Sequence, residues 1–195
     1  MRRLLLILTI IGFGMAFVLI PIGYRSHLSV KYRNFRTVSP GVLYRSGQMT
    51  TEGLTQKVRE HGLKTVVSLR ELRDKDGKTD ADHAEIEFCR NNGVRHLVLT
   101  PMQWRREQEE HAPVEENLAA FLKLMNDPTN HPVLVHCFAG IHRTGGYVAM
   151  YRMQFDRWTA EEAVEEMKTM GTPRTTFDPD TSALLRHLEG KSFIR

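Results

Sequence analysis

The segment that decides the fold is His136-Cys137-Phe138-Ala139-Gly140-Ile141-His142-Arg143-Thr144-Gly145. It follows the apolar, β-branched run 132–136, which is typical of a buried strand, and it leads into a helical pattern over 143–156. A loop between a strand end and a helix N-terminus turns its amides toward one point, where the helix dipole also favours an anion. The segment therefore predicts an anion-binding loop with a cysteine at its mouth.

The residue types in this loop suit one kind of chemistry. The positive end of the helix favours the Cys137 thiolate, which is the form that acts as a nucleophile. Arg143 presents a planar, permanently charged fork that matches two phosphate oxygens. Gly140 lets the backbone come close to a ligand, and the Thr144 hydroxyl can donate to the sulfur. A nucleophile, the amides of 138–143 and a cationic clamp together predict covalent phosphoryl transfer.

Strand and helix patterns alternate on both sides of the loop. Strand patterns lie at 35–38, 42–45, 65–69, 94–99 and 132–136, and helical patterns lie at 50–61, 79–91, 113–125, 143–156, 160–170 and 178–189. Such alternation is typical of parallel sheets covered by helices on both faces. We therefore expect one α/β domain over residues 29–195, with a mainly parallel central sheet flanked by helices.

A different kind of segment precedes this domain. Residues 4–22 form an uncharged run of 19 residues, with Arg2 and Arg3 before it and Arg25 after it. A helix of that length crosses a hydrocarbon core of roughly 30 Å, so we expect residues 1–28 to be a single-pass transmembrane anchor. A cleaved signal peptide and a buried soluble helix are the alternatives. Basic residues flank both ends of the run, so the positive-inside rule does not choose the side of the catalytic domain.

Charge and cysteine content exclude several other classes of protein. Residues 1–36 hold six of the 27 basic residues and no acidic one, which leaves 21 basic against 23 acidic residues in the rest of the chain. We therefore do not expect the domain to bind nucleic acid. Cys89 and Cys137 are the only cysteines, too few for a disulfide framework or a cysteine-based zinc site. Cys89 is expected in the core, and no metal or cofactor is predicted.

The loop resembles the signature H-C-x-x-G-x-x-R-[ST]-G of protein tyrosine and dual-specificity phosphatases, and all fixed positions match. The stretch 41–48 (GVLYRSGQ), the run 64–71 and the loop's end at 141–144 are similar to compact atypical dual-specificity phosphatases, a group that includes inositol pyrophosphate phosphatases. The resemblance extends over about residues 35–186. It implies that Cys137 forms a cysteinyl-phosphate, that Arg143 binds phosphate and the transition state, and that Thr144 helps to expel the thiolate. The implied phosphate-binding residues are Phe138, Ala139, Gly140, Ile141, His142 and Arg143.

The sequence departs from this family at the general acid. The family supplies an aspartate from a mobile loop before the cysteine, but no aspartate lies between Asp82 and Asp127. Glu107 lies nearest the expected place, with Glu109 and Glu110 in the same polar segment. A glutamate there can protonate a leaving alkoxide. The alternatives are that all three only solvate a loop, and that a pyrophosphate substrate leaves without an acid.

These observations predict a cysteine-dependent phosphatase that hydrolyses phosphate monoesters of proteins (phosphotyrosine, phosphoserine or phosphothreonine) or of inositol phosphates. Two alternatives stay open: a phosphate-binding pseudophosphatase or scaffold, which the missing aspartate suggests, and a rhodanese-like sulfurtransferase, which also uses a cysteine in an anion-binding loop. Arg45 and Arg70 are either further anion contacts or ordinary surface charges. His136 is expected to orient the loop through backbone hydrogen bonds, and Trp104 either stacks on a substrate or packs against the core.

Overall fold

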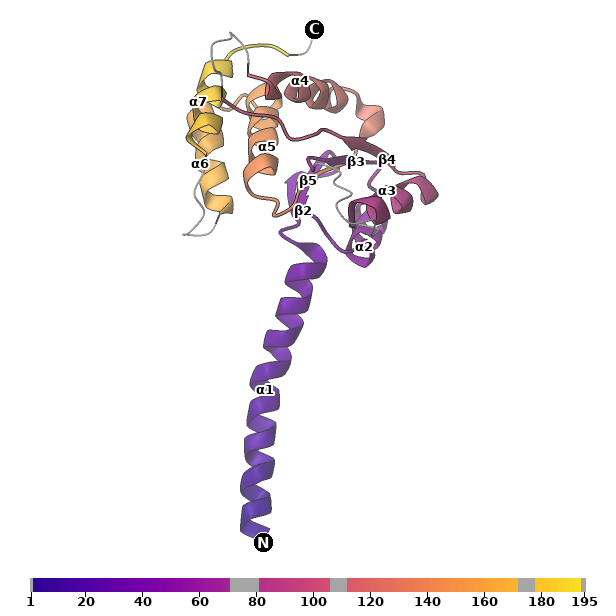
Figure 1. Cartoon of the computed structure of the whole chain (residues 1–195), viewed down its shortest axis with the longest axis vertical. Helices are drawn as coiled ribbons and strands as arrows, with labels where there is room; N and C mark the ends of the chain where they lie inside the picture. Colours follow the sequence, from indigo (N-terminus) through magenta and orange to yellow (C-terminus); the bar gives the residue numbers. More distant parts are fainter. Residues whose placement is uncertain (1, 71–80, 106–111, 172–177, 194–195) are drawn as a thin grey trace.

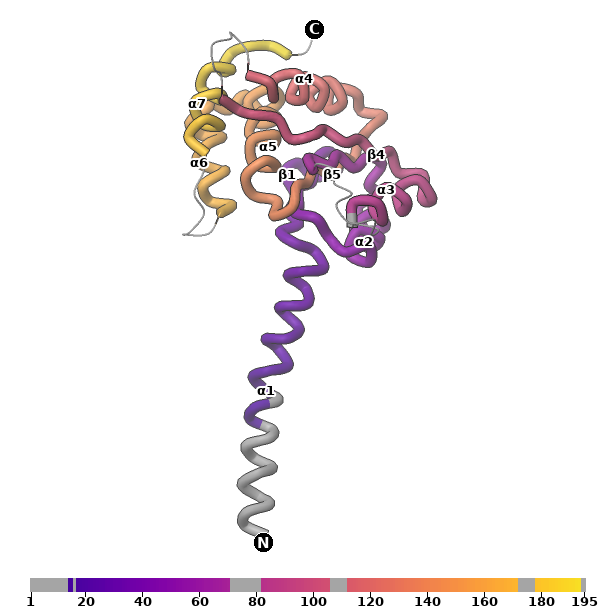
Figure 2. Tube along the Cα trace, in the orientation of Figure 1, coloured from indigo at the N-terminus to yellow at the C-terminus, as the bar shows by residue number. Residues whose placement is uncertain are grey.

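The computed structural model describes residues 2–70, 81–105, 112–171 and 178–193, and for residues 2–13, 16 and 81 it describes the backbone only (Figure 2). Helices and strands alternate along this part of the chain (Figure 1). The strands are β1 (Arg36–Ser39), β2 (Leu43–Gly47), β3 (Thr65–Ser68), β4 (Arg95–Val98) and β5 (Val133–Cys137). The helices are α1 (Arg2–Tyr32), α2 (Thr51–His61), α3 (Ala81–Asn91), α4 (Val114–Met125), the 3-10 helix η1 (Pro128–Asn130), α5 (His142–Phe155), α6 (Ala160–Met170) and α7 (Pro179–Leu188).

The described strands form one sheet in the order β1-β2-β5-β3-β4. The central strand β5 pairs in parallel with β2 and β3, and β4 pairs in parallel with β3. β1 pairs antiparallel with β2, because the turn between them is too short for the crossover that a parallel pair needs. Gly41 has φ +72° in that turn. The expectation of a mainly parallel sheet is therefore wrong: the sheet is mixed, with an antiparallel edge strand.

Helices cover both faces of the sheet (Figure 1). Successive side chains of a strand point to opposite faces, and β5 shows this division clearly. Val133 and Val135 lie in the larger core, which α4, α5, α6 and α7 share. Leu134 lies in the smaller core, together with Leu54 of α2 and Cys89 of α3. The central strand β5 is thus buried on both sides, and this holds its carboxyl end in one place.

Local capping signals set the ends of several helices. Thr50 caps α2 by accepting a hydrogen bond from the Gly53 N–H at 3.1 Å, and Gly62 ends the same helix with φ +62°. Thr159 and Glu162 form a reciprocal capping box at the start of α6. These ends agree with the helix boundaries expected at 50–61 and 160–170, so local sequence decides them.

Helix α1 continues without a break to Tyr32 and extends away from the domain (Figure 1). The boundary expected between residues 28 and 29 therefore falls inside a helix. Among the residues whose side chains are described, no helix has both the length and the apolarity needed to cross a membrane. Much of the expected span, namely residues 4–13 and 16, lies outside those described side chains.

Candidate active site

The loop of interest begins where the central strand ends. Cys137 is the last residue of β5 and is only 5% exposed, and α5 starts five residues later at His142. Gly47 at the end of β2 is in register with Cys137, and β3 ends beside it on the other side. Because these three strands are parallel, their carboxyl ends meet at one edge of the sheet, which is where α/β folds place ligands.

The backbone of the loop is held with its carbonyl groups turned outward. Three successive loop carbonyls accept hydrogen bonds from groups outside the loop: Phe138 O from Gln48 N–H at 3.0 Å, Ala139 O from Asn34 Nδ2 at 2.9 Å, and Gly140 O from Arg45 Nη2 at 2.9 Å. With the carbonyls held in this way, the amides of the same peptide units face the space around Cys137. This is the geometry of an anion-binding nest.

Both the backbone conformation at position 140 and the small space around it require a glycine. Its φ of +74° lies in the left-handed region, which strains residues that carry a side chain. A Cβ at this position would also collide with the backbone of Ser46 and Gly47. The close approach lets the Gly140 N–H donate to Cys137 Sγ at 3.2 Å. The glycine therefore brings an amide to the sulfur.

The surroundings of Cys137 favour its thiolate. Burial by itself raises the pKa of this thiol, but hydrogen bonds from the Thr144 hydroxyl and from the amides of Thr144, Gly140 and Ile141 outweigh burial, and the pKa is lowered overall. The Thr144 hydroxyl is buried and has no hydrogen-bond partner of good geometry among the described residues, so it acts on the sulfur through proximity rather than through a well-formed hydrogen bond. Cys89 gives the contrast, because burial raises its pKa to about 12. Only Cys137 has the environment of a reactive cysteine.

Arg143 and His142 lie in the first turn of α5, and both are exposed. The Arg143 guanidinium donates from Nη1 to the Leu69 carbonyl at 3.1 Å, just beyond the end of β3. This bond fixes one arm of the fork beside the loop and leaves its other donors for oxyanion oxygens. Phe138 is 57% exposed and lies beside two guanidinium groups, those of Arg33 at 4.5 Å and Arg70 at 5.3 Å from the ring centroid.

A buried histidine–glutamate pair, His136 and Glu85, lies behind the loop. His136 is 1% exposed, and its Nε2 lies 2.9 Å from Glu85 Oε1, while its Nδ1 lies 3.3 Å from the Cys137 carbonyl oxygen. His96 reaches the same Glu85 oxygen at 3.0 Å. Burial lowers the pKa of His136, but the neighbouring Glu85 carboxylate outweighs this and raises it. Both partners of His136 are hydrogen-bond acceptors, and this favours the protonated ring, in which both nitrogens donate.

Several sequence expectations are resolved by this geometry. Arg45 is 3% exposed, so it is not an ordinary surface charge, and burial lowers its pKa to about 10. It holds the outer side of the loop rather than facing a substrate. Trp104 packs against Gly146 and Tyr147 on α5, which agrees with a packing role. Glu107 lies outside the described residues.

The sequence did not single out Asn34 or Glu85. Both act on the loop from positions far away in the chain, and neither belongs to a local motif. The positive φ of Asn34 (+58°) is compatible with asparagine, but that gives no indication of its partner. The buried Glu85 on α3 could have been suspected only from its place in the apolar pattern around Cys89.

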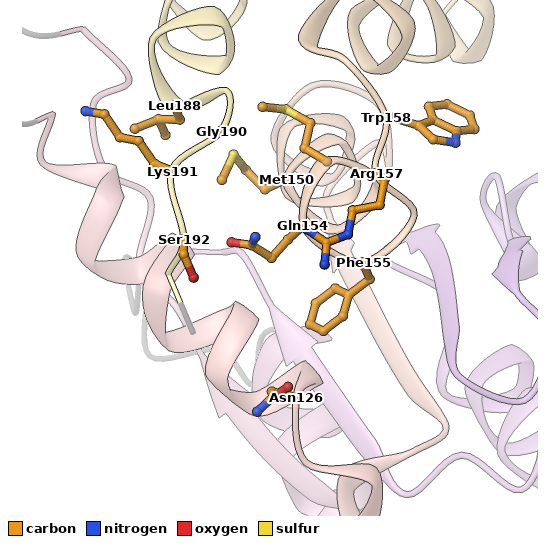
Figure 3. A pocket seen from close by; sticks show the side chains of 11 residues that line it. Asn126, Met150, Gln154, Phe155, Arg157, Trp158, Leu188, Gly190, Lys191 and Ser192 are labelled. Carbon is orange, nitrogen blue, oxygen red and sulfur yellow. The ribbon is translucent and has the colours of Figure 1, made fainter. Parts of the chain in front are cut away.

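A pocket of about 340 Å³ lies elsewhere in the fold (Figure 3). It is bordered by Met150 and Phe155 from the C-terminal half of α5, and by Leu188 and Lys191 at the end of α7 and beyond. The loop that contains Cys137 precedes the N-terminal end of α5. None of the predicted site residues lines this pocket, so it is not the candidate active site.

Comparisons with known proteins show the family to which the chain is similar. A family model described as "DSP-PTPase phosphatase fused to NAD+ Kinase" matches residues 29–183. Inositol diphosphatase DSP1 of Oryza sativa subsp. japonica is 36% identical over 83 residues, which are 43% of this chain and 36% of that protein. The aligned regions span well under half the length of the first curated relatives, 36% and 39%.

Solved structures show the same fold. The crystal structure of Pseudomonas aeruginosa TpbA matches with a TM-score of 0.58 and 28% identity, over 80% of this chain and 84% of that one. The catalytic domain of the PP-IP phosphatase SIW14 from S. cerevisiae matches with a TM-score of 0.62 and 21% identity, over 80% and 85%.

Proposed function

Since the chain belongs to the family of dual-specificity-type phosphatases described as "DSP-PTPase phosphatase fused to NAD+ Kinase", we propose that it hydrolyses phosphate monoesters through a cysteinyl-phosphate on Cys137. One observation carries this proposal. The thiol whose pKa is lowered lies inside a loop whose carbonyl groups are bonded outward and whose amides face the sulfur. That combination offers a nucleophile and an anion site at the same point.

In the first step the Cys137 thiolate attacks the phosphorus atom and the bond to the leaving oxygen breaks. The loop amides and the Arg143 guanidinium bind the other phosphate oxygens, whose charge they stabilise in the transition state. The leaving oxygen takes a proton, for which Glu107 is the proposed donor. In the second step water attacks the phosphorus and gives a proton to the carboxylate that the first step left on the proposed donor. The sulfur–phosphorus bond breaks, and the Thr144 hydroxyl stabilises the departing thiolate.

The proposed substrates are phosphorylated tyrosine, serine or threonine in proteins, or inositol phosphates. Support comes from relatives named as dual-specificity and inositol phosphatases. Direct assay of phosphate release from each of these classes identifies the substrate.

Comparison of the wild type with Cys137→Ser tests the function. A serine hydroxyl is not ionised at neutral pH, so turnover should fall by more than about a hundredfold. Cys89→Ser is the matched control, because its thiol lies in the core away from the loop. Phosphate release that survives in Cys137→Ser would remove this residue from the mechanism. A protein that binds phosphate without turnover would be a pseudophosphatase, and thiocyanate formation would indicate a sulfurtransferase.

We also propose that residues 1–28 hold the domain at a membrane. The proposal rests on the uncharged run 4–22 and on large apolar side chains of α1 that are open to solvent in this structure. Phe17 is 84% exposed and Ile20 is 69% exposed. Apolar surface of this kind is normally covered by a partner or by lipid.

A further inference from the structure

The turn that follows α1 lies directly against the phosphate-binding loop. Figure 1 shows the end of α1 reaching the domain close to β2 and β5, and hydrogen bonds confirm this contact. The Gly47 N–H donates to the Arg33 carbonyl at 2.6 Å, and Asn34 Nδ2 donates to the Ala139 carbonyl at 2.9 Å. Arg33 and Asn34 both have positive φ, +25° and +58°. The chain thus turns sharply at these two residues and directs both of them toward the loop.

The Arg33 side chain lies against Gly47, the residue of β2 that is in register with Cys137. A Cβ on Gly47 would lie 2.6 Å from Arg33 Cγ and 2.5 Å from the Phe138 carbonyl oxygen. Gly47 is in register with Cys137, so the stem of Arg33 lies within a few ångströms of the loop. Its guanidinium carbon then lies 4.5 Å from the Phe138 ring centroid. Only a glycine at 47 leaves room for this approach.

The charge on Arg33 is not neutralised by the described part of the chain. None of the described ion pairs involves Arg33, whereas the neighbouring Arg70 is paired with Asp82 at 2.6 Å and 2.9 Å. A guanidinium without an ionic partner, placed beside an anion-binding loop, attracts a second negative group of the molecule whose phosphate the loop binds.

The turn is also held firmly from the other side. Lys31 forms an ion pair with Glu52 at 2.5 Å, and the Tyr32 hydroxyl donates to Gln56 Oε1 at 2.5 Å, both on α2. The Thr50 N–H donates to the Lys31 carbonyl at 3.3 Å. These contacts fix the last turn of α1 on the domain, so Arg33 and Asn34 do not swing freely.

We infer that the turn at residues 33–34 is a working part of the phosphate site: Asn34 is a positioning residue for the loop, and Arg33 binds a second anionic group of the substrate on the Phe138 side. The inference rests on the proposed phosphatase function, because that function is what makes the bound anion a substrate. Asn34 keeps the Ala139 carbonyl turned outward, and the adjoining amide therefore stays turned toward the anion. Arg33 extends the site beyond the single phosphate that the loop accommodates.

Anion binding tests the role of Arg33 without any need for turnover. The full chain carrying Cys137→Ser is titrated calorimetrically with inorganic phosphate and with pyrophosphate, with and without Arg33→Gln. A lost charged hydrogen bond corresponds to about tenfold in Kd, so Arg33→Gln should weaken pyrophosphate about tenfold and leave phosphate within about twofold. Arg36→Gln is the matched control, since that exposed arginine is three residues away and contacts Met170.

Equal weakening of both anions, or no change in either, would overturn the role of Arg33. The result does not depend on catalysis. If the wild type hydrolysed no phosphate ester but still bound pyrophosphate through Arg33, the proposed function would fail while this inference stood.

The role of Asn34 is tested with two variants. Asn34→Asp keeps the shape but removes the donor, and Asn34→Gly keeps the left-handed backbone but removes the side chain. Both should lower kcat for p-nitrophenyl phosphate about tenfold with little change in KM, and both should move the pH midpoint of Cys137 alkylation by iodoacetamide upward. Asn92→Asp is the control, because Asn92 Nδ2 donates to the Phe88 carbonyl at 2.8 Å away from the loop. A wild-type kcat and alkylation profile in Asn34→Gly would refute a positioning role.

Discussion

Replacing Glu85 by glutamine removes a buried charge that lies behind the loop after Cys137. Glu85 is 6% exposed, and one of its oxygens contacts both His136 at 2.9 Å and His96 at 3.0 Å. Burial would raise the pKa of Glu85, but these histidines outweigh burial and hold the pKa at about 2, against 4.5 for a free glutamate. Each pKa unit corresponds to about 1.4 kcal/mol, so the carboxylate stabilises the fold by about 3 kcal/mol. Loss of one partner of a buried pair commonly costs about 3–5 kcal/mol.

The pH dependence of this contribution follows from the direction of each shift. The pKa of Glu85 is lower in the folded state, so its contribution is complete above pH 4.5 and is lost as the pH falls toward 2. The pKa of His136 is raised above 6.5 in the folded state, so its contribution is complete below pH 6.5 and is lost at higher pH as the imidazole deprotonates. The pair therefore stabilises the fold most between about pH 4.5 and 6.5.

Urea unfolding at a series of pH values measures this effect. At pH 6 the free energy of unfolding of Glu85→Gln should be about 3 kcal/mol below that of the wild type, and the difference should shrink between pH 4.5 and pH 2. Glu165→Gln is the control, because Glu165 pairs with Lys168 at 3.0 Å on the exposed surface, where ion pairs contribute little. A difference below about 1 kcal/mol at pH 6, or one that grows as the pH falls, would refute the argument.

Four further predictions concern the loop and the N-terminal segment. Arg143→Lys should be nearly as damaging to kcat/KM as Arg143→Ala, because lysine loses the two-pronged match to phosphate oxygens; near-normal kinetics in the lysine variant would leave only an electrostatic role. Gly140→Ala should abolish phosphate binding in calorimetry while the chain still folds, since its Cβ would collide with the backbone of β2; wild-type affinity would contradict this. Glu107→Gln should slow hydrolysis of alkyl phosphates about 10²–10⁴-fold but aryl phosphates far less, because a phenolate leaves without a proton; an equal small effect on both would exclude it as the acid. Residues 1–28 should retain the full-length chain in membranes during alkaline carbonate extraction, and soluble protein of full mass would disprove the anchor.

Local sequence determined most of the secondary structure and the position of the candidate nucleophile. Helix ends at Thr50, Gly62 and Thr159 follow from short-range hydrogen bonds and from the left-handed backbone that glycine accepts, so neighbouring residues suffice to predict them. The alternation of strands and helices predicted an α/β fold. The spacing of Cys137 and Arg143 predicted that a candidate nucleophile and a candidate phosphate-binding arginine lie at the two ends of one short loop, and the structure places them at the end of β5 and the start of α5.

Only the tertiary structure decided what holds that loop in shape. Asn34 and Arg45 bond to carbonyls 105 and 95 residues further along the chain, and Glu85 meets His136 across 51 residues. Such contacts form because the sheet brings distant strand ends to a common edge, and no local pattern encodes which distant donor meets which carbonyl. The sequence alone could therefore name Cys137 as the candidate nucleophile, whereas the outward-held carbonyl groups of its loop required the fold.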